Sequence, residues 1–118
     1  MSVQEDYVVY YTVPKTEEAM KIWLPGITDY EKYDHFEVNE QVNNMLWSLY
    51  DQFNEKFNIL IDNCEDETLS FDNLSEALIM AEQFATRSSD EIQKEVLVKL
   101  ISAIKNAIRY NTCVYFDF

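Results

Sequence analysis

The chain has 118 residues, of which 47% are hydrophobic and 14% aromatic, and its formal net charge is −13. This length predicts a single domain over residues 1–118, and the apolar content is too high for a disordered acidic tail. The charge disfavours direct binding to nucleic acid or to an anionic membrane, because both depend mainly on lysine and arginine. The single glycine disfavours a phosphate-binding loop.

The first predicted element is a strand over residues 7–13, where β-branched and aromatic residues run together. Thr16 is then followed by two glutamates, as is typical of a helix N-terminus with acids in its first turn. We therefore expect a short helix over residues 16–24, ended by Pro25 and the following glycine. Apolar residues in this segment also alternate, so a strand stays open as the alternative.

The middle of the chain predicts one amphipathic helix over residues 38–56, because apolar residues recur there at intervals of three and four. The apolar run at 57–61 then predicts a short strand. This strand would run into a polar loop over residues 62–68.

Two further helices are predicted over residues 72–87 and 90–110, each with one apolar stripe. Residues 113–118 alternate as a half-buried strand does. Three strands and three main helices predict an α+β fold, in which the helices pack on a small sheet.

The sequence also lacks the usual signals for membranes and for disulfide or zinc frameworks. No stretch of about 18 apolar residues occurs, and the N-terminus has no basic start of a secretory signal. These features predict a cytoplasmic protein. Cys64 and Cys113 are too few and too far apart for a disulfide framework or a zinc site, and we expect no cofactor.

A catalytic or metal site finds little support. His35 is the sole histidine, and the acids beside Cys64 disfavour the thiolate that a Cys64–His35 pair would need. The segment from Asp62 to Asn73 starts like a calcium loop, but Cys64, Glu67 and Asn73 stand at three of its defining positions. We therefore expect no catalytic residue and no metal ligand.

The acidic residues are unevenly distributed. Residues 1–86 hold 18 Asp and Glu against 4 Lys, a balance of −14, whereas residues 87–118 hold 4 acids and 5 bases. Such a field would speed the encounter with a basic protein and orient it. The same charge would also keep a protein without any partner soluble.

The segment TDYEKYDHFE, residues 28–37, combines four carboxylates with three aromatic rings. Tyr30, Tyr33 and Phe36 are three residues apart, so a helical turn would place the rings on one face with acids beside them. Tyrosine is favoured at protein interfaces, and the acids would suit lysine and arginine of a partner. The alternative is that the rings cap the core while the carboxylates stay hydrated.

The loop DNCEDE, residues 62–67, could form a second acidic patch. The predicted partner-binding residues are therefore Asp29, Tyr30, Glu31, Tyr33, Asp34, Glu37, Asp62, Glu65, Asp66 and Glu67.

Three features together resemble, in type, the immunity proteins of bacterial toxin systems, including those of contact-dependent growth inhibition. They are TDYEKYDHFE, DNCEDE, and the helix-helix-strand end from NLSEALIMAEQF to VYFDF. No family motif matches position by position, so no functional residue is transferred. The resemblance implies a tight complex with a basic toxin domain, often a nuclease, whose active site or substrate groove is blocked.

Other classes stay open. A nucleic-acid mimic of the phage or anti-restriction type would need an extended row of acids on one face. A small enzyme would need a concave site around His35 or Cys64, and an adaptor would need neither.

Overall fold

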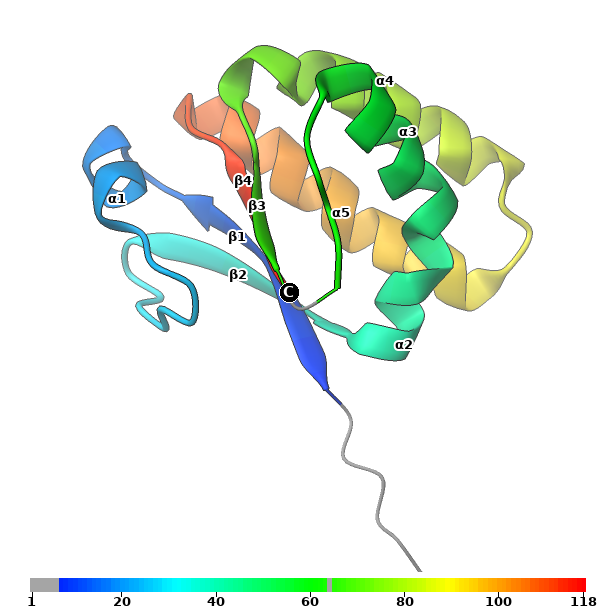
Figure 1. Ribbon diagram of the computed structural model, residues 1–118, viewed down its shortest axis with the longest axis horizontal. Helices are drawn as coiled ribbons and strands as arrows, with labels where there is room; N and C mark the ends of the chain where they lie inside the picture. The colour runs from blue at the N-terminus through cyan, green and yellow to red at the C-terminus, as the bar shows by residue number, and fades with distance from the viewer. Residues whose placement is uncertain (1–6, 64) are drawn as a thin grey trace, which may run out of the picture.

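The sheet is built around β1 (Val8–Pro14), which pairs antiparallel with β2 (Tyr33–Asn39) on one side and with β4 (Val114–Asp117) on the other. β3 (Asp66–Leu69) pairs antiparallel with β4, so the strand order is β2-β1-β4-β3 (Figure 1). The computed structural model describes residues 7–63 and 65–118. The α+β class expected from the sequence is confirmed.

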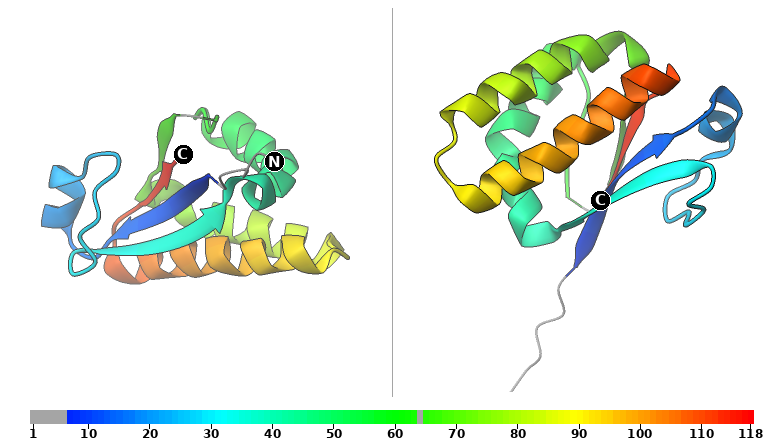
Figure 2. Two further views of the ribbon diagram at one scale, coloured as in Figure 1. Left: turned by 90° about the horizontal axis from the view of Figure 1, so that it is seen from below. Right: turned by 180° about the vertical axis from the view of Figure 1, so that it is seen from behind.

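The helices connect these strands and cover mainly one face of the sheet. In chain order they are α1 (Glu17–Ile22), α2 (Glu40–Asn43), the 3₁₀ turn η1 (Asn44–Leu46), α3 (Trp47–Phe57), α4 (Phe71–Arg87) and α5 (Glu91–Tyr110). α5 packs against β1 and β2, and α4 packs against α5 and α3. Figure 2 shows α4 and α5 together on one side of the β1–β2 ribbon, with α1 at the far end of the ribbon from α3.

The hydrophobic core lies between the sheet and α3, α4 and α5. Val9, Tyr11 and Val13 alternate along β1 and are all buried, and Phe116 lies opposite Tyr11 on β4. The helices contribute one stripe each, which includes Leu49, Tyr50 and Phe53 of α3, Leu74, Ala77 and Ala81 of α4, and Val96, Leu100 and Ile104 of α5. The period-two and helical patterns of the sequence therefore meet in one core.

Several predicted elements are confirmed by the structure. β1, β4, α4 and α5 lie within one or two residues of the expected ranges 7–13, 113–118, 72–87 and 90–110. The segment expected at 16–24 is a helix rather than a strand, and Thr16 caps it by accepting a hydrogen bond from the Ala19 amide at 3.0 Å.

The single helix expected over 38–56 is instead interrupted. Residues 33–39 form β2, and the helical segment that follows is broken by η1 before α3 starts at Trp47. The break coincides with Asn43, which is fully buried and accepts hydrogen bonds from the hydroxyls of Tyr11 and Tyr50. The amphipathic pattern of the sequence predicts which apolar residues are buried, but it does not predict that the polar side chain of Asn43 lies in the core.

The strand expected at 57–61 is wrong, and the third strand lies in the segment expected to be a polar loop. α3 ends at Phe57, and Asn58 adopts the left-handed conformation that ends helices. Ile61 is buried, but its backbone is held by the side chain of Asn54, which accepts from the Ile61 amide at 2.7 Å and donates to its carbonyl at 3.1 Å. The polar residues of β3 suit an edge strand, which needs buried side chains on only one face.

The helical turn expected within 28–37 is also wrong. Residues 30–32 form a turn held by Asp29, whose carboxylate accepts from the amides of Glu31 and Lys32, and β2 starts at Tyr33. Tyr33 and Phe36 therefore point to opposite faces of the sheet, because side chains alternate along a strand.

Candidate functional site

The face of the sheet turned away from α3, α4 and α5 carries the candidate site, and we call it the outer face. The register pairs Thr12 with His35 and Tyr10 with Glu37 on this face, while Asp117 of β4 also lies opposite Tyr10. α1 and the loop over residues 23–32 cover one end of the outer face. The other end is exposed to solvent at Glu37 and Val8.

One row of polar side chains crosses all four strands at the exposed end. It consists of Glu37 (β2), Tyr10 (β1), Asp117 (β4) and Asp66 (β3), and we call it the acidic row. With a strand spacing of ~4.8 Å, the row is about 14 Å long. Within residues 7–63 and 65–118, none of its three carboxylates forms an ion pair within 4 Å.

Like charges lie next to each other in this row. Asp66 and Asp117 are directly opposite on antiparallel strands, which is an unfavourable pairing for two carboxylates. The arrangement has a cost in the free protein that a cationic group placed over the row would remove.

Tyr10 lies between the acids and takes part in their hydrogen bonding. Its hydroxyl donates to Oε1 of Glu37 at 3.3 Å. Partial burial, followed by the negative charge of Glu37, raises the pKa of Tyr10 above its ordinary value of 10.0. The phenol therefore stays protonated and presents an apolar ring with a polar tip to the outer face.

The covered end of the outer face is held rigidly to the sheet. The ring of Trp23 stacks on that of Tyr115 at a centroid distance of 4.0 Å, and the hydroxyl of Tyr33 donates to the Ala19 carbonyl at 2.6 Å. The amide of Gly26 donates to Oδ2 of Asp117 at 2.9 Å. Asp117 thereby joins the loop to the acidic row.

A small cavity lies where this loop meets the row, and we call it the His35 niche. Its volume is about 40 Å³. It is lined by Tyr10, Gly26, Ile27, Thr28, Tyr30, His35 and Asp117. The ring of Tyr30 meets that of His35 edge to face at 4.8 Å between centroids. Nδ1 of His35 lies 3.2 Å from Oγ1 of Thr12.

The structure separates the residues of the predicted cluster at 28–37. Tyr30 is 66% exposed and Glu31 is exposed, whereas Tyr33 is only 1% exposed and cannot reach a partner. Asp34 lies on the helix side, where it accepts a hydrogen bond from Asn106 and pairs with Lys15. Asp29 is occupied by the turn that it forms.

The predicted acidic loop is divided in the same way. Asp62 and Glu65 are exposed, and Asp66 belongs to the acidic row. Glu67 points to the helix side, where its carboxylate accepts hydrogen bonds from the amides of Leu60 and Thr68. Of the ten predicted residues, Glu37 and Asp66 come together in the row.

Sequence reasoning missed Tyr10 and Asp117 as site residues. Both belong to predicted strands. Side chains alternate along a strand, so Tyr10 and Asp117 point to the other face of the sheet from their buried neighbours Tyr11 and Phe116. The alternation could therefore have shown that both face outward. Only the strand order could show that they are neighbours.

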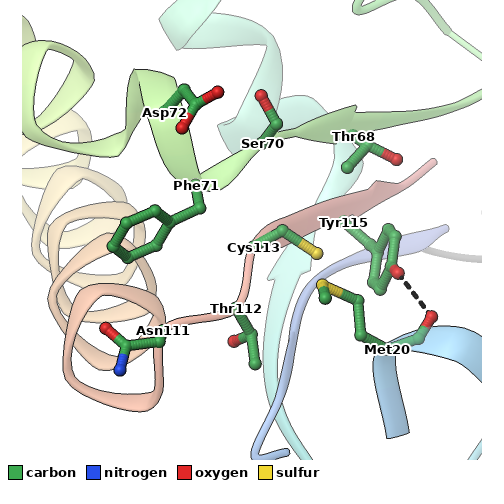
Figure 3. A pocket seen from close by; sticks show the side chains of 9 residues that line it. All are labelled: Met20, Thr68, Ser70, Phe71, Asp72, Asn111, Thr112, Cys113 and Tyr115. Atoms are coloured by element: carbon green, nitrogen blue, oxygen red, sulfur yellow. Dashed lines mark hydrogen bonds between the residues drawn. The ribbon is translucent and has the colours of Figure 1, made fainter. Parts of the chain in front are cut away.

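A further cavity, of about 320 Å³, lies between α1, the start of α4 and the end of α5 (Figure 3). The buried thiol of Cys113 lines it together with Thr68, Ser70 and Tyr115. Burial raises the pKa of Cys113 to about 11, so the thiol is protonated at neutral pH and is a poor nucleophile. Cys64, the other thiol considered, lies outside the described residues.

Comparison of the chain with protein-family models, with curated proteins and with solved structures finds no match. Among residues 7–63 and 65–118, no group of three or more His, Cys, Asp or Glu is arranged to hold a metal ion. None of the helices in the same ranges has the length and apolar content to cross a membrane.

Proposed function

We propose that this protein is an immunity protein, which neutralises a cognate basic toxin domain by covering its active site with the outer face. The observation that supports the proposal most directly is the acidic row. Three carboxylates from strands far apart in sequence lie side by side on an exposed face, with a tyrosine among them. The proposal assigns binding and no catalysis to this chain, and it places the complex in the cytoplasm.

The physical mechanism is steering followed by occlusion. The carboxylates of the row accelerate the encounter with a cationic surface and orient it. A toxin that cleaves nucleic acid holds phosphates with lysine and arginine, and the row would pair with those groups and exclude the substrate. The exposed ring of Tyr30 and the half-exposed ring of Tyr10 would supply contact area that slows dissociation.

The experiment that tests this proposal compares two triple variants of equal charge. In the row variant, Glu37→Gln, Asp66→Asn and Asp117→Asn remove the three carboxylates while keeping similar shapes. In the control variant, Glu55→Gln, Glu82→Gln and Glu95→Gln remove three exposed acids from α3, α4 and α5. Partners are captured with the wild-type protein from cells that carry the gene and are identified by mass spectrometry.

We expect a basic partner whose toxicity and enzymatic activity are blocked by the wild-type protein. The row variant should associate with it at least about tenfold more slowly at low salt, and the control variant should associate almost normally. An acidic partner, or an association rate that does not change with ionic strength, would contradict the proposal. Capture of many unrelated nucleic-acid-binding proteins would instead identify a nucleic-acid mimic.

A further inference from the structure

The His35 niche has the size of a single terminal group. Its volume of about 40 Å³ exceeds the ~10–15 Å³ that one water molecule needs. It is far smaller than the ~300–1,000 Å³ of pockets that enclose a drug-sized ligand. The niche can therefore accept the tip of one side chain from a partner, but not a whole small molecule.

The chemistry of the niche selects a cation. Asp117 contributes a carboxylate, of which Oδ2 already accepts a hydrogen bond from Gly26. Its other oxygen forms no hydrogen bond or ion pair with the described residues. Tyr10 and Tyr30 add aromatic rings, which attract a cation placed over their faces.

One ring nitrogen of His35, which lines the niche, lacks a hydrogen-bond partner. Nε2 of His35 is buried and has no hydrogen-bond partner among the described residues, whereas buried polar atoms in proteins nearly always have one. The neighbouring ring of Tyr30 belongs to a largely exposed side chain that is not part of the core, so its rotation disturbs no core packing. Such a rotation would open the niche toward Nε2 and supply an acceptor when Nδ1 donates its proton to Thr12.

We infer that the niche is a recognition site for one lysine ammonium of the basic partner. An ammonium is compact and has three donors, and the niche is lined by a carboxylate (Asp117), a phenol (Tyr10) and an imidazole (His35) that can accept them. The planar guanidinium of arginine is larger and is suited to bidentate contact with an open carboxylate. This inference rests on the proposed function and specifies which side chain of the partner is placed beside the acidic row.

The test uses the isolated protein and a lysine probe, Nα-acetyl-lysine N-methylamide. Gly26 is the sole glycine of the chain, and its amide donates a hydrogen bond to the carboxylate of Asp117. The NMR signal of the Gly26 amide therefore reports directly on the niche. We expect a saturable shift of this signal with a Kd of ~1–10 mM. The Nε-acetylated probe, which has no charge, should produce none, and the arginine counterpart should bind more weakly.

Two variants with the same charge change separate a local effect at the niche from a general effect of net charge. Asp117→Asn should raise the Kd of the lysine probe by about threefold to fivefold, as expected for the loss of one partly exposed charge pair. Glu82→Gln makes the same charge change at an exposed position of α4, on the helix side of the sheet, and should leave the affinity almost unchanged. An unmoved Gly26 signal, equal binding of the neutral or arginine probe, or equal loss in the two variants would overturn the inference.

The two proposals can fail separately. If the probe binds as expected but no basic partner is captured, the immunity function is wrong and the ammonium site stands. If the row variant loses its partner while the probe leaves Gly26 unaffected, the niche is not a lysine site and the docking face stands.

Discussion

The hydroxyl oxygens of Tyr11 and Tyr50 lie 2.7 Å apart in the centre of the core, and each also contacts Oδ1 of Asn43. This buried polar triangle ties β1 to α3 at the point where the helical segment is interrupted. The two hydroxyls have two protons for three contacts, so only two of the three can be hydrogen bonds at one time. Nδ2 of Asn43 has no partner among the described residues.

Asn43→Ala should therefore destabilise the fold. Loss of the acceptor leaves two buried hydroxyls that share one remaining contact, so we expect the free energy of unfolding to fall by about 2–4 kcal/mol. Urea denaturation measures this change. Gln83→Ala, on the exposed side of α4, is the control and should change the free energy by less than about 0.5 kcal/mol. A similar effect of both substitutions would show that the triangle contributes nothing special.

Three buried tyrosines and a buried cysteine make the fold sensitive to alkali. Burial raises the pKa values of Tyr11, Tyr50 and Tyr115 above 10.0, and that of Cys113 from 9.0 to about 11. The folded state keeps these protons when the unfolded chain has lost them, so stability is complete below about pH 9 and falls as the pH rises further.

Each such tyrosine should contribute a slope of about 1.4 kcal/mol per pH unit above about pH 10. Urea denaturation over this range measures the total slope. Tyr50→Phe should reduce it, although the variant is less stable at neutral pH. A free energy of unfolding that stays constant up to about pH 11 would contradict the burial of these groups.

Asn54 is predicted to hold the segment that replaces the expected strand. Its side chain makes two hydrogen bonds to the backbone of Ile61, in place of the partners that a sheet would supply. Asn54→Ala should lower the free energy of unfolding by about 1–3 kcal/mol. It should also speed hydrogen exchange at the Ile61 amide far more than at the amides of α5. Unchanged protection of Ile61 would mean that its burial alone fixes the loop.

Removing one carboxylate from the acidic row should stabilise the free protein. Asp66→Asn relieves the repulsion with Asp117, and we expect a gain well under ~1 kcal/mol that shrinks at high salt. Thermal unfolding at low and high ionic strength measures it, with Glu82→Gln as the control for net charge. A loss of stability would show that the two carboxylates are held apart or are compensated.

The helices and strands with the clearest apolar periodicity could be predicted from the sequence, whereas the strand made of polar residues could not. α5 has an uninterrupted apolar stripe and a polar cap at Asp90, so its helix is determined locally. β3 has no such signal, because its sequence DETL becomes a strand only by pairing with β4. The apolar run at 57–61 shows the reverse error, because it buries Ile61 without forming a strand and leaves Leu60 exposed.

The candidate site depended even more on tertiary structure. Sequence proximity placed Tyr30, Tyr33 and Asp34 in one cluster, but the start of β2 sends the side chains of Tyr33 and Asp34 to opposite faces of the sheet. Glu37 and Asp66 were predicted in two separate patches, and the strand order joins them through Tyr10 and Asp117. No local pattern contains that information.

The position of β4 between β1 and β3 has a consequence for newly made protein. Pairing of β1 with β4 brings together segments separated by nearly the whole chain, and such long-range pairing forms slowly and late. Until residues 114–117 have paired with β1, β3 has no neighbouring strand among the described residues and the acidic row lacks Asp117. The outer face therefore takes its final shape in the last steps of folding, and a slow step in forming the β1–β4 pair would delay the whole surface.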